Sequence, residues 1–205
     1  MDKFVHDKNY AKFLFLKDPN CEHSSYLSEF ISFIKSQKIM SPFVFSYVGD
    51  ETNLLPALTL NENILMNFSP RSLTTEKDNQ FEEFLSHKEN YYIKKLYDKL
   101  GEREVLASVA SPEMKKLTSL IKALTTESEY IFLENPEKDL SENIRILFSK
   151  ALDIHLEQYE INAFIYSSNQ EMWKSHCSHS VYRNKYFQFQ IESITVDKVK
   201  KKTAA

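Results

Sequence analysis

The hydrophobic positions of the chain alternate between short continuous runs and repeats with helical spacing. Continuous runs of β-branched and aromatic residues are typical of buried strands, and they predict strands at residues 10–16, 43–47, 130–133 and 161–166. Apolar residues three and four positions apart predict helices at residues 25–35, 79–100, 111–124 and 141–157. Strands and helices thus follow one another along the chain. This order predicts an α/β fold with a mostly parallel central sheet and helices on both of its faces.

Three local signals refine this prediction. Residues 79–100 carry two separate apolar stripes, so we expect two helical pieces that end before Gly101, a suitable residue just beyond a helix C-terminus. Ser111 followed by Pro112 is a good start for the helix at 111–124. Residues 181–191 predict a terminal hairpin with its turn at Arg183, Asn184 and Lys185.

Composition is that of an ordinary globular protein, and it narrows the possible classes. The chain has 205 residues, of which 42% are hydrophobic and 27% charged, and its net charge is −3. The length suits one domain, and the net charge argues against nucleic-acid binding over the whole surface. No apolar run is long enough to span a membrane and the N-terminus has no signal-peptide pattern, so we expect a cytoplasmic protein. The two cysteines, Cys21 and Cys177, are expected to be free thiols.

Glycine is the most informative residue type, because the chain contains only two glycines. Loops that bind phosphate use glycine so that backbone N–H groups can close around the anion. Gly49 and Gly101 lie far apart in the sequence. The chain therefore cannot build a glycine-rich nucleotide loop.

Three stretches nevertheless resemble the ATPase subunits of ABC transporters, in the order of that family. The segment DPNCEHSSYL, residues 18–27, is similar to the family's phosphate loop, GPNGSGKSTL. The segment LLPALTLNENI, residues 54–64, is similar to the region after its Q-loop. The helix, strand and turn that end in Glu134-Asn135-Pro136 are similar to its signature helix and Walker B segment. The resemblance implies a P-loop NTPase fold with a helical subdomain and a reduced antiparallel subdomain.

The same resemblance implies a division of the chain. It covers residues 1–192 as a single degenerate domain, with the helical subdomain at about 66–125. Residues 193–205 are expected to form a basic, flexible tail that contains Lys198, Lys200, Lys201 and Lys202.

The resemblance also implies that most positions which grip nucleotide in this family have changed. In the phosphate loop, the glycines are replaced by Asp18, Cys21 and His23, the lysine by Ser24, and only Ser25 matches the hydroxyl that holds magnesium. Asp50 replaces the Q-loop glutamine, and Ser168 the switch histidine. The signature segment reads Ser111-Pro112-Glu113, and the Walker B aspartate and catalytic glutamate are replaced by Glu134 and Asn135.

Interaction energies indicate how these replacements would affect nucleotide binding. Each lost charge-assisted hydrogen bond costs about 1.5–3 kcal/mol. A carboxylate ~4 Å from a phosphate adds roughly 4 kcal/mol of repulsion at an effective dielectric constant of about 20. The amide of Asn135 cannot act as a general base at neutral pH. We therefore expect no catalytic residue, no bound cofactor and no metal site.

The sequence leaves three functions open. The first is a pseudo-ATPase that pairs with an active ABC ATPase subunit, with a membrane permease, or with a second copy of itself, and that reaches the membrane only through its partner. The second is a stand-alone interaction or regulatory protein on the same fold. The third is an enzyme with a site rebuilt around Glu134, Asp50 and Ser25, in which Glu134 and Ser25 could hold a cation.

A second cluster could carry chemistry of its own. His176, Cys177 and His179 invite a metal or thiol interpretation, because the two histidines lie three positions apart, a spacing compatible with one helix face. No second Cys/His pair with zinc spacing accompanies them. The alternative interpretation is a pair of surface histidines beside a buried cysteine, and the sequence leaves the role of this cluster open.

Overall fold

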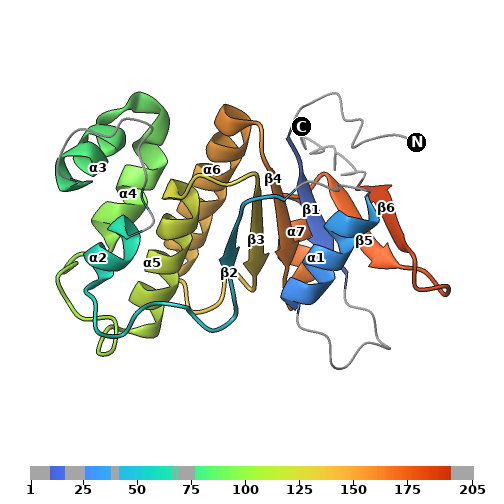
Figure 1. Ribbon diagram of the computed structural model, residues 1–205, viewed down its shortest axis with the longest axis horizontal. Helices are drawn as coiled ribbons and strands as arrows, with labels where there is room; N and C mark the ends of the chain where they lie inside the picture. Colours follow the sequence, from blue (N-terminus) through green and yellow to red (C-terminus); the bar gives the residue numbers. More distant parts are fainter. Residues whose placement is uncertain (1–9, 17–25, 38–41, 67, 69–76, 195–205) are drawn as a thin grey trace, which may run out of the picture.

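The structure of the protein is a computed structural model that describes residues 10–16, 26–37, 42–66, 68 and 77–194 (Figure 1). Six strands form one sheet in the order β2-β3-β4-β1-β5-β6. The strands are β1 (Lys12–Phe15), β2 (Phe45–Val48), β3 (Tyr130–Glu134), β4 (Asn162–Tyr166), β5 (His179–Arg183) and β6 (Phe189–Ser193). Neighbouring strands from β2 to β5 are parallel, and β6 is antiparallel to β5. The predicted α/β fold with a mostly parallel sheet is confirmed.

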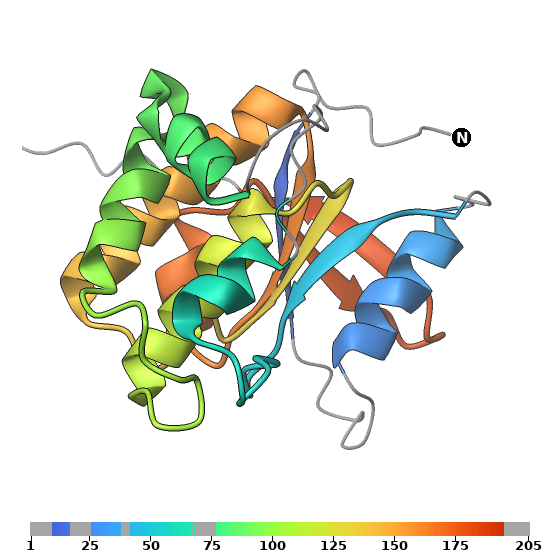
Figure 2. The same cartoon turned by 60° about the vertical axis from the view of Figure 1, so that its left-hand side comes forward.

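The two faces of the sheet bury different kinds of side chain, because successive residues of a strand point to opposite faces. Aromatic residues such as Phe13, Phe132 and Phe164 lie on one face, where they pack against α1 (Tyr26–Ser36). Aliphatic residues such as Leu14 and Ile165 belong to the cluster on the other face. Figure 2 shows α1 on one side of the sheet and the remaining long helices on the other. The central strands β1, β3 and β4 are therefore buried on both faces, which explains their continuous apolar runs, whereas β6 is largely exposed.

The other helices lie between β2 and β5 in the sequence. They are α2 (Leu60–Leu65), α3 (Lys77–Ser86), the 3₁₀ helix η1 (Lys88–Asn90), α4 (Tyr91–Lys99), α5 (Pro112–Thr125), α6 (Glu142–Tyr159) and α7 (Gln170–Lys174). Of these, α2, α3 and α4 lie beyond α5 and α6 at one end of the molecule (Figure 1). The expected two helical pieces at 79–100 are found as α3 and α4. Gly101 follows α4 with a φ of +65°, as the C-terminal signal predicted.

The short helix α7 was not predicted, and two further details of the fold differ from the prediction. The short helix α2 was not predicted, although Thr59 and Glu62 form a capping box: the Thr59 hydroxyl accepts from the Glu62 N–H at 3.1 Å, and the Glu62 carboxylate accepts from the Thr59 N–H at 2.7 Å. Arg183 lies in β5 and not in the hairpin turn. Its backbone pairs with that of Phe189 in β6, and its guanidinium contacts the Glu29 carboxylate of α1 at 2.8 Å.

The described part of the chain ends at Ile194, one residue beyond β6. Ser193 is the last residue of β6, and residues 195–205 of the predicted tail lie outside the part of the chain that the structure describes. None of the helices in the described ranges is both long and apolar enough to cross a membrane.

Candidate functional site

The carboxyl ends of the parallel strands bring together polar residues that are far apart in the sequence. In the sheet, β2 pairs with β3 and β3 with β4, so the residues that follow these strands meet at one edge. Those residues are Asp50 after β2, Asn135 after β3 and Ser168 after β4. Open α/β sheets bind their ligands at this edge. Four of the residues that the sequence singled out, Asp50, Glu134, Asn135 and Ser168, therefore lie together.

Asn135 connects the three strand ends through its side chain. Its amide nitrogen donates to Asp50 Oδ1 at 3.2 Å, and its amide oxygen accepts from the backbone N–H of Ser168 at 2.8 Å. Its own backbone N–H donates to the carbonyl oxygen of Tyr166 at 2.8 Å. Asn135 has a φ of +43°, in the left-handed region that asparagine tolerates better than most residues. Both ends of its side chain are thus engaged within the protein.

Asp50 is held by a cation as well as by Asn135. The Lys138 ammonium lies 2.8 Å from Asp50 Oδ2. This hydrogen bond, together with the Lys138 charge, lowers the pKa of Asp50 below its ordinary value. Asp50 is therefore an ionised carboxylate at neutral pH, with one oxygen on Lys138 and the other on Asn135.

Three tyrosines surround the carboxylate of Glu134. The Tyr47 hydroxyl donates to Glu134 Oε2 at 2.6 Å. Tyr26, the first residue of α1, stacks on Tyr166 with ring centroids 3.5 Å apart, and the Tyr26 hydroxyl donates to the Tyr166 hydroxyl at 2.6 Å. Burial, and then the hydrogen bond to Glu134, raise the pKa of Tyr47, so its phenol stays protonated. Glu134 therefore accepts from one protonated tyrosine, and it lies beside a stacked pair of two others.

A buried lysine, Lys116 of α5, binds two backbone carbonyl groups at this site. Its side chain is 1% exposed, and its ammonium donates to the carbonyl oxygens of Gly49 at 2.9 Å and Glu134 at 3.3 Å. Burial lowers its pKa, while the nearby Asp50 carboxylate opposes that shift. Sequence analysis missed this residue. A signal was available, because Lys116 lies four positions before Leu120 on the apolar stripe, where a charged residue is unusual.

A second buried polar group lies beside the strand ends. Glu137 is 8% exposed and its carboxylate accepts from the Trp173 indole N–H at 2.8 Å and from the Ser167 hydroxyl. Ser167 Oγ in turn accepts from the backbone N–H of Asn169 at 2.9 Å. Glu137 therefore ties the turn after β3 to the loop after β4 and to α7. Nothing in the local sequence pattern indicated this role.

The predicted signature segment is not part of this cluster. Ser111 caps α5 through a hydrogen bond from the Met114 N–H at 3.3 Å, and Pro112 is the first helical residue, as the sequence predicted. The Glu113 carboxylate accepts from the Ser141 N–H at 2.7 Å, at the start of α6. The segment thus braces two helix starts against each other. The signature segment itself does not contact the strand ends. Lys116, one turn further along α5, makes that contact.

The predicted phosphate loop directly precedes α1 in the sequence. Asp18, Cys21, His23, Ser24 and Ser25 all lie outside the residues that the structure describes.

The structure separates the members of the histidine and cysteine cluster. His176 follows the end of α7, and His179 is the first residue of β5, so the two histidines do not share the helix face with which their spacing was compatible. Cys177 is buried, and burial raises the pKa of its thiol to about 12, which keeps it protonated and unreactive. Within the described ranges, no group of three or more His, Cys, Asp or Glu residues is arranged to hold a metal ion.

Sequence comparisons identify no relatives. No protein-family model matches the chain, and a comparison with curated proteins finds no similar sequence.

Comparison with solved structures does find similar folds. An ATP-binding subunit of an ABC transporter matches with a TM-score of 0.64 and 11% identity, over 84% of this chain and 74% of that one. A dimeric ATP-binding cassette bound to ADP and Pi matches with a TM-score of 0.59 and 12% identity, over 91% and 86%. An archaeal ribosome recycling factor in complex with a ribosomal stalk protein matches with a TM-score of 0.63 and 13% identity, over 90% of this chain and 34% of that one. The chain therefore has the P-loop fold of the ATPase subunits of ABC transporters.

Proposed function

We propose that the protein is a catalytically silent ABC ATPase-like subunit that acts through contacts with a protein partner. The observation that carries this proposal is the closed network at the strand ends. Asn135 stands where the resemblance places the catalytic glutamate, and its amide is held by Asp50 on one side and by the Ser168 backbone on the other. An amide has no proton that titrates near neutral pH, so this position supplies no general base.

Neighbouring groups do not replace the missing base. The Asp50 carboxylate is bound by Lys138 and Asn135, and the Glu134 carboxylate accepts the Tyr47 hydroxyl. Each carboxylate thus already has a donor within the protein. The resemblance further implies a phosphate loop with acidic residues and no lysine, which disfavours a bound polyphosphate.

We expect the purified protein to hydrolyse Mg·ATP at least about 100-fold more slowly than an active ABC ATPase subunit in the same assay, because loss of a general base alone costs about 10²–10⁴ in rate. Phosphate release measured at saturating ATP tests this expectation. Variant Glu134→Gln is the control, since it removes the carboxylate that directly precedes Asn135 in the sequence and leaves the contact between Asp50 and Asn135 in place. Turnover in the wild-type protein that Glu134→Gln abolishes would instead support an enzyme with a rebuilt site.

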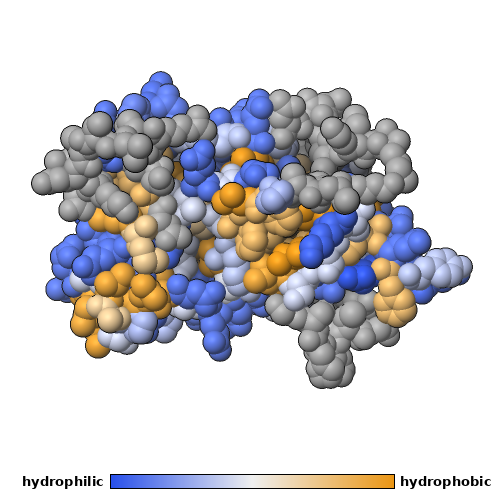
Figure 3. Space-filling model, in the orientation of Figure 1, coloured by the Kyte–Doolittle hydropathy of each residue, from blue (hydrophilic) through white to orange (hydrophobic). Residues whose placement is uncertain are grey.

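A surface for the partner is available at the end of the molecule that carries α2. The loops before α2 and before α5 pair through an isolated bridge between Thr59 and Leu106, and they expose Leu55, Leu106 and Val109. Val109 is 75% exposed. Figure 3 shows apolar surface over this end of the molecule. Exposed apolar side chains on a braced loop are typical of protein contacts.

We expect the double variant Leu106→Asp/Val109→Asp to weaken association with the partner at least about tenfold, because carboxylates in an apolar contact would lose their hydration. Affinity purification from the protein's own cells, with mass spectrometry of the bound proteins, measures the loss. Variant Ile146→Asp is the matched control, since Ile146 is an exposed aliphatic residue that belongs to α6 and to neither of these loops. Recovery of an ATPase or a permease supports the proposal. Recovery of only unrelated soluble proteins would favour a stand-alone interaction protein.

A further inference from the structure

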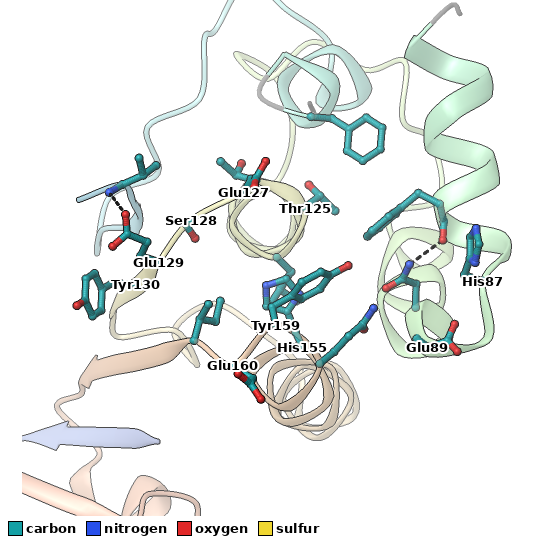
Figure 4. Close-up of a pocket in the computed structure, with 18 of the residues that line it drawn as sticks. His87, Glu89, Thr125, Glu127, Ser128, Glu129, Tyr130, His155, Tyr159 and Glu160 are labelled. Atoms are coloured by element: carbon teal, nitrogen blue, oxygen red, sulfur yellow. Dashed lines mark hydrogen bonds between the residues drawn. The ribbon is translucent and has the colours of Figure 1, made fainter. Parts of the chain in front are cut away.

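The sheet has two edge strands, β2 and β6, and β6 is the more exposed of the two. Every side chain of β2 is buried or half-buried, and its amino end borders a cavity in which the Glu129 carboxylate accepts from the Val44 N–H at 3.4 Å (Figure 4). In β6, the residues from Gln190 to Ser193 are all exposed. Figure 1 shows β6 at the opposite end of the molecule from α2, α3 and α4. An additional strand therefore has more room beside β6 than beside β2.

The pairing of β6 with β5 determines which of its backbone groups face outward. The Asn184 N–H donates to the Gln188 carbonyl at 2.9 Å, and hydrogen-bonded pairs alternate with non-bonded pairs along an antiparallel ladder. Every second residue of β6 therefore turns its N–H and C=O away from β5. These residues are Phe189, Ile191 and Ser193. Among the described residues, nothing forms a hydrogen bond with their outward backbone groups, and such a row is a template for another strand.

β6 lacks the features with which edge strands usually avoid pairing. Its sequence, FQIES, contains no lysine and no proline, and its register with β5 runs without a bulge. Ile191, at the centre of the strand, is 37% exposed. A second strand beside β6 would cover this aliphatic side chain and satisfy the outward backbone groups.

We propose that β6 pairs antiparallel with β6 of a second copy of the chain, about a two-fold axis between the two Ile191 residues. In this register the strand is complementary to itself. Ile191 faces Ile191 of the second copy, and the two residues exchange both of their N–H···O=C bonds. The Gln190 amide faces the Glu192 carboxylate of the second copy, and the axis repeats this contact. Glu192 Oε1 accepts from the Tyr182 hydroxyl, which leaves Oε2 for the amide.

Other two-fold registers are less favourable. An axis at Glu192 would place two carboxylates directly opposite each other, which destabilises a strand pair. An axis at Gln190 would pair only the residues from Phe189 to Ile191. The axis at Ile191 pairs the whole of β6 and places each carboxylate against a neutral amide. This contact uses neither the strand-end site nor the loops that carry Leu106 and Val109, so it does not depend on the proposed function.

Sedimentation equilibrium of the full chain tests the proposal. We expect a dimer with a Kd on the order of 10 µM, since one strand pair is smaller than a standard interface. Ile191→Lys should weaken the dimer at least about tenfold, because two ammonium groups would face each other at the axis. Tyr186→Lys is the matched control, since Tyr186 is 69% exposed in the turn of the same hairpin but lies outside β6. A chain that stays monomeric at about 100 µM would overturn the proposal. Equal weakening by both variants would also do so, because it would indicate association through the hairpin turn.

Substitutions at Gln190 give a readout that a merely structural role would not. Gln190→Lys would face Glu192 of the second copy and should strengthen the dimer about fivefold. Gln190→Glu would face the same carboxylate and should weaken the dimer by a similar factor of about five. Gln190 is exposed, so both variants should fold. Changes of the same sign in the two variants would contradict the contact between Gln190 and Glu192.

Cysteine cross-linking tests the position of the axis in a Cys21→Ser background. Ile191→Cys should form an intermolecular disulfide under a mild oxidant, because directly paired residues of antiparallel strands are within disulfide reach. Ser193→Cys is the matched control: it also faces outward from β6, but the proposed axis keeps it roughly 14 Å from its copy. Cys177 is buried and should stay reduced. Failure of Ile191→Cys to cross-link, or faster cross-linking of Ser193→Cys, would overturn the proposed pairing.

Discussion

Replacing Glu137 by leucine is expected to lower the free energy of unfolding by about 3–5 kcal/mol, the loss typical of breaking a buried polar network. The Glu137 carboxylate is the shared acceptor for the Trp173 indole N–H and the Ser167 hydroxyl. Leucine has a similar volume but accepts neither bond, so two buried donors would be left unpaired at about 1–3 kcal/mol each. Chemical denaturation followed by Trp173 fluorescence measures the effect, because Trp173 is the single tryptophan of the chain.

The controls for this prediction separate charge from hydrogen bonding. Glu137→Gln keeps one carbonyl oxygen as an acceptor and should lose only about 1–2 kcal/mol. Glu142→Leu changes an exposed glutamate in the first turn of α6 and should stay within about 0.5–1 kcal/mol of the wild type. If Glu137→Leu were as stable as Glu142→Leu, the link between the turn after β3 and α7 would contribute nothing to stability.

Replacing Lys116 by methionine is expected to cost about 2–4 kcal/mol of unfolding free energy. The ammonium of Lys116 satisfies the carbonyl oxygens of Gly49 and Glu134, which belong to the ends of two neighbouring strands. Methionine fills a similar space without donating, so both carbonyls lose a charge-assisted bond worth about 1.5–3 kcal/mol. Removing the buried charge recovers part of its desolvation cost, which keeps the expected loss below the sum of the two bonds.

Lys115→Met is the matched control for this variant. Lys115 is the neighbouring lysine on the same helix, and its ammonium makes one long hydrogen bond, 3.4 Å, to the Ser108 carbonyl at the surface. Its replacement should cost less than about 1 kcal/mol. If Lys116→Met and Lys115→Met were equally stable, the two hydrogen bonds of the buried ammonium would do no more than offset the cost of desolvating it.

The pH dependence of stability gives a separate readout for Lys116. Because burial lowers its pKa in the folded protein below the ordinary 10.5, the unfolded chain binds more protons in the window between those two values. The contribution of Lys116 to unfolding free energy should therefore rise with pH in that alkaline window. This rise should be missing from Lys116→Met and present in Lys115→Met.

Sequence patterns predicted the architecture because they report on burial, which is local. The apolar runs around Phe13, Phe132 and Phe164 identified strands buried on both faces, and the stripe through Leu117 and Leu120 identified a helix. The order of strands and helices then predicted the sheet, and the comparison with solved structures agrees with that fold.

The polar residues that follow the carboxyl ends of the strands were also largely predictable from the sequence. Asp50, Asn135 and Ser168 follow three predicted strands, and parallel neighbours end at the same edge of a sheet. The resemblance to ABC ATPases indicated which of these positions matter. It did not indicate that Asn135 bonds to both Asp50 and the Ser168 backbone.

The chain by itself thus determined the elements, their order and the polarity of the strand ends, since each depends on residues close together in sequence. Tertiary structure alone decided which polar groups are paired. Lys116 bonds to a carbonyl 67 positions away, and Glu137 meets Trp173 across 36 positions. A hydrogen bond depends on distance and direction in space, and no periodicity along the sequence encodes either for residues so far apart.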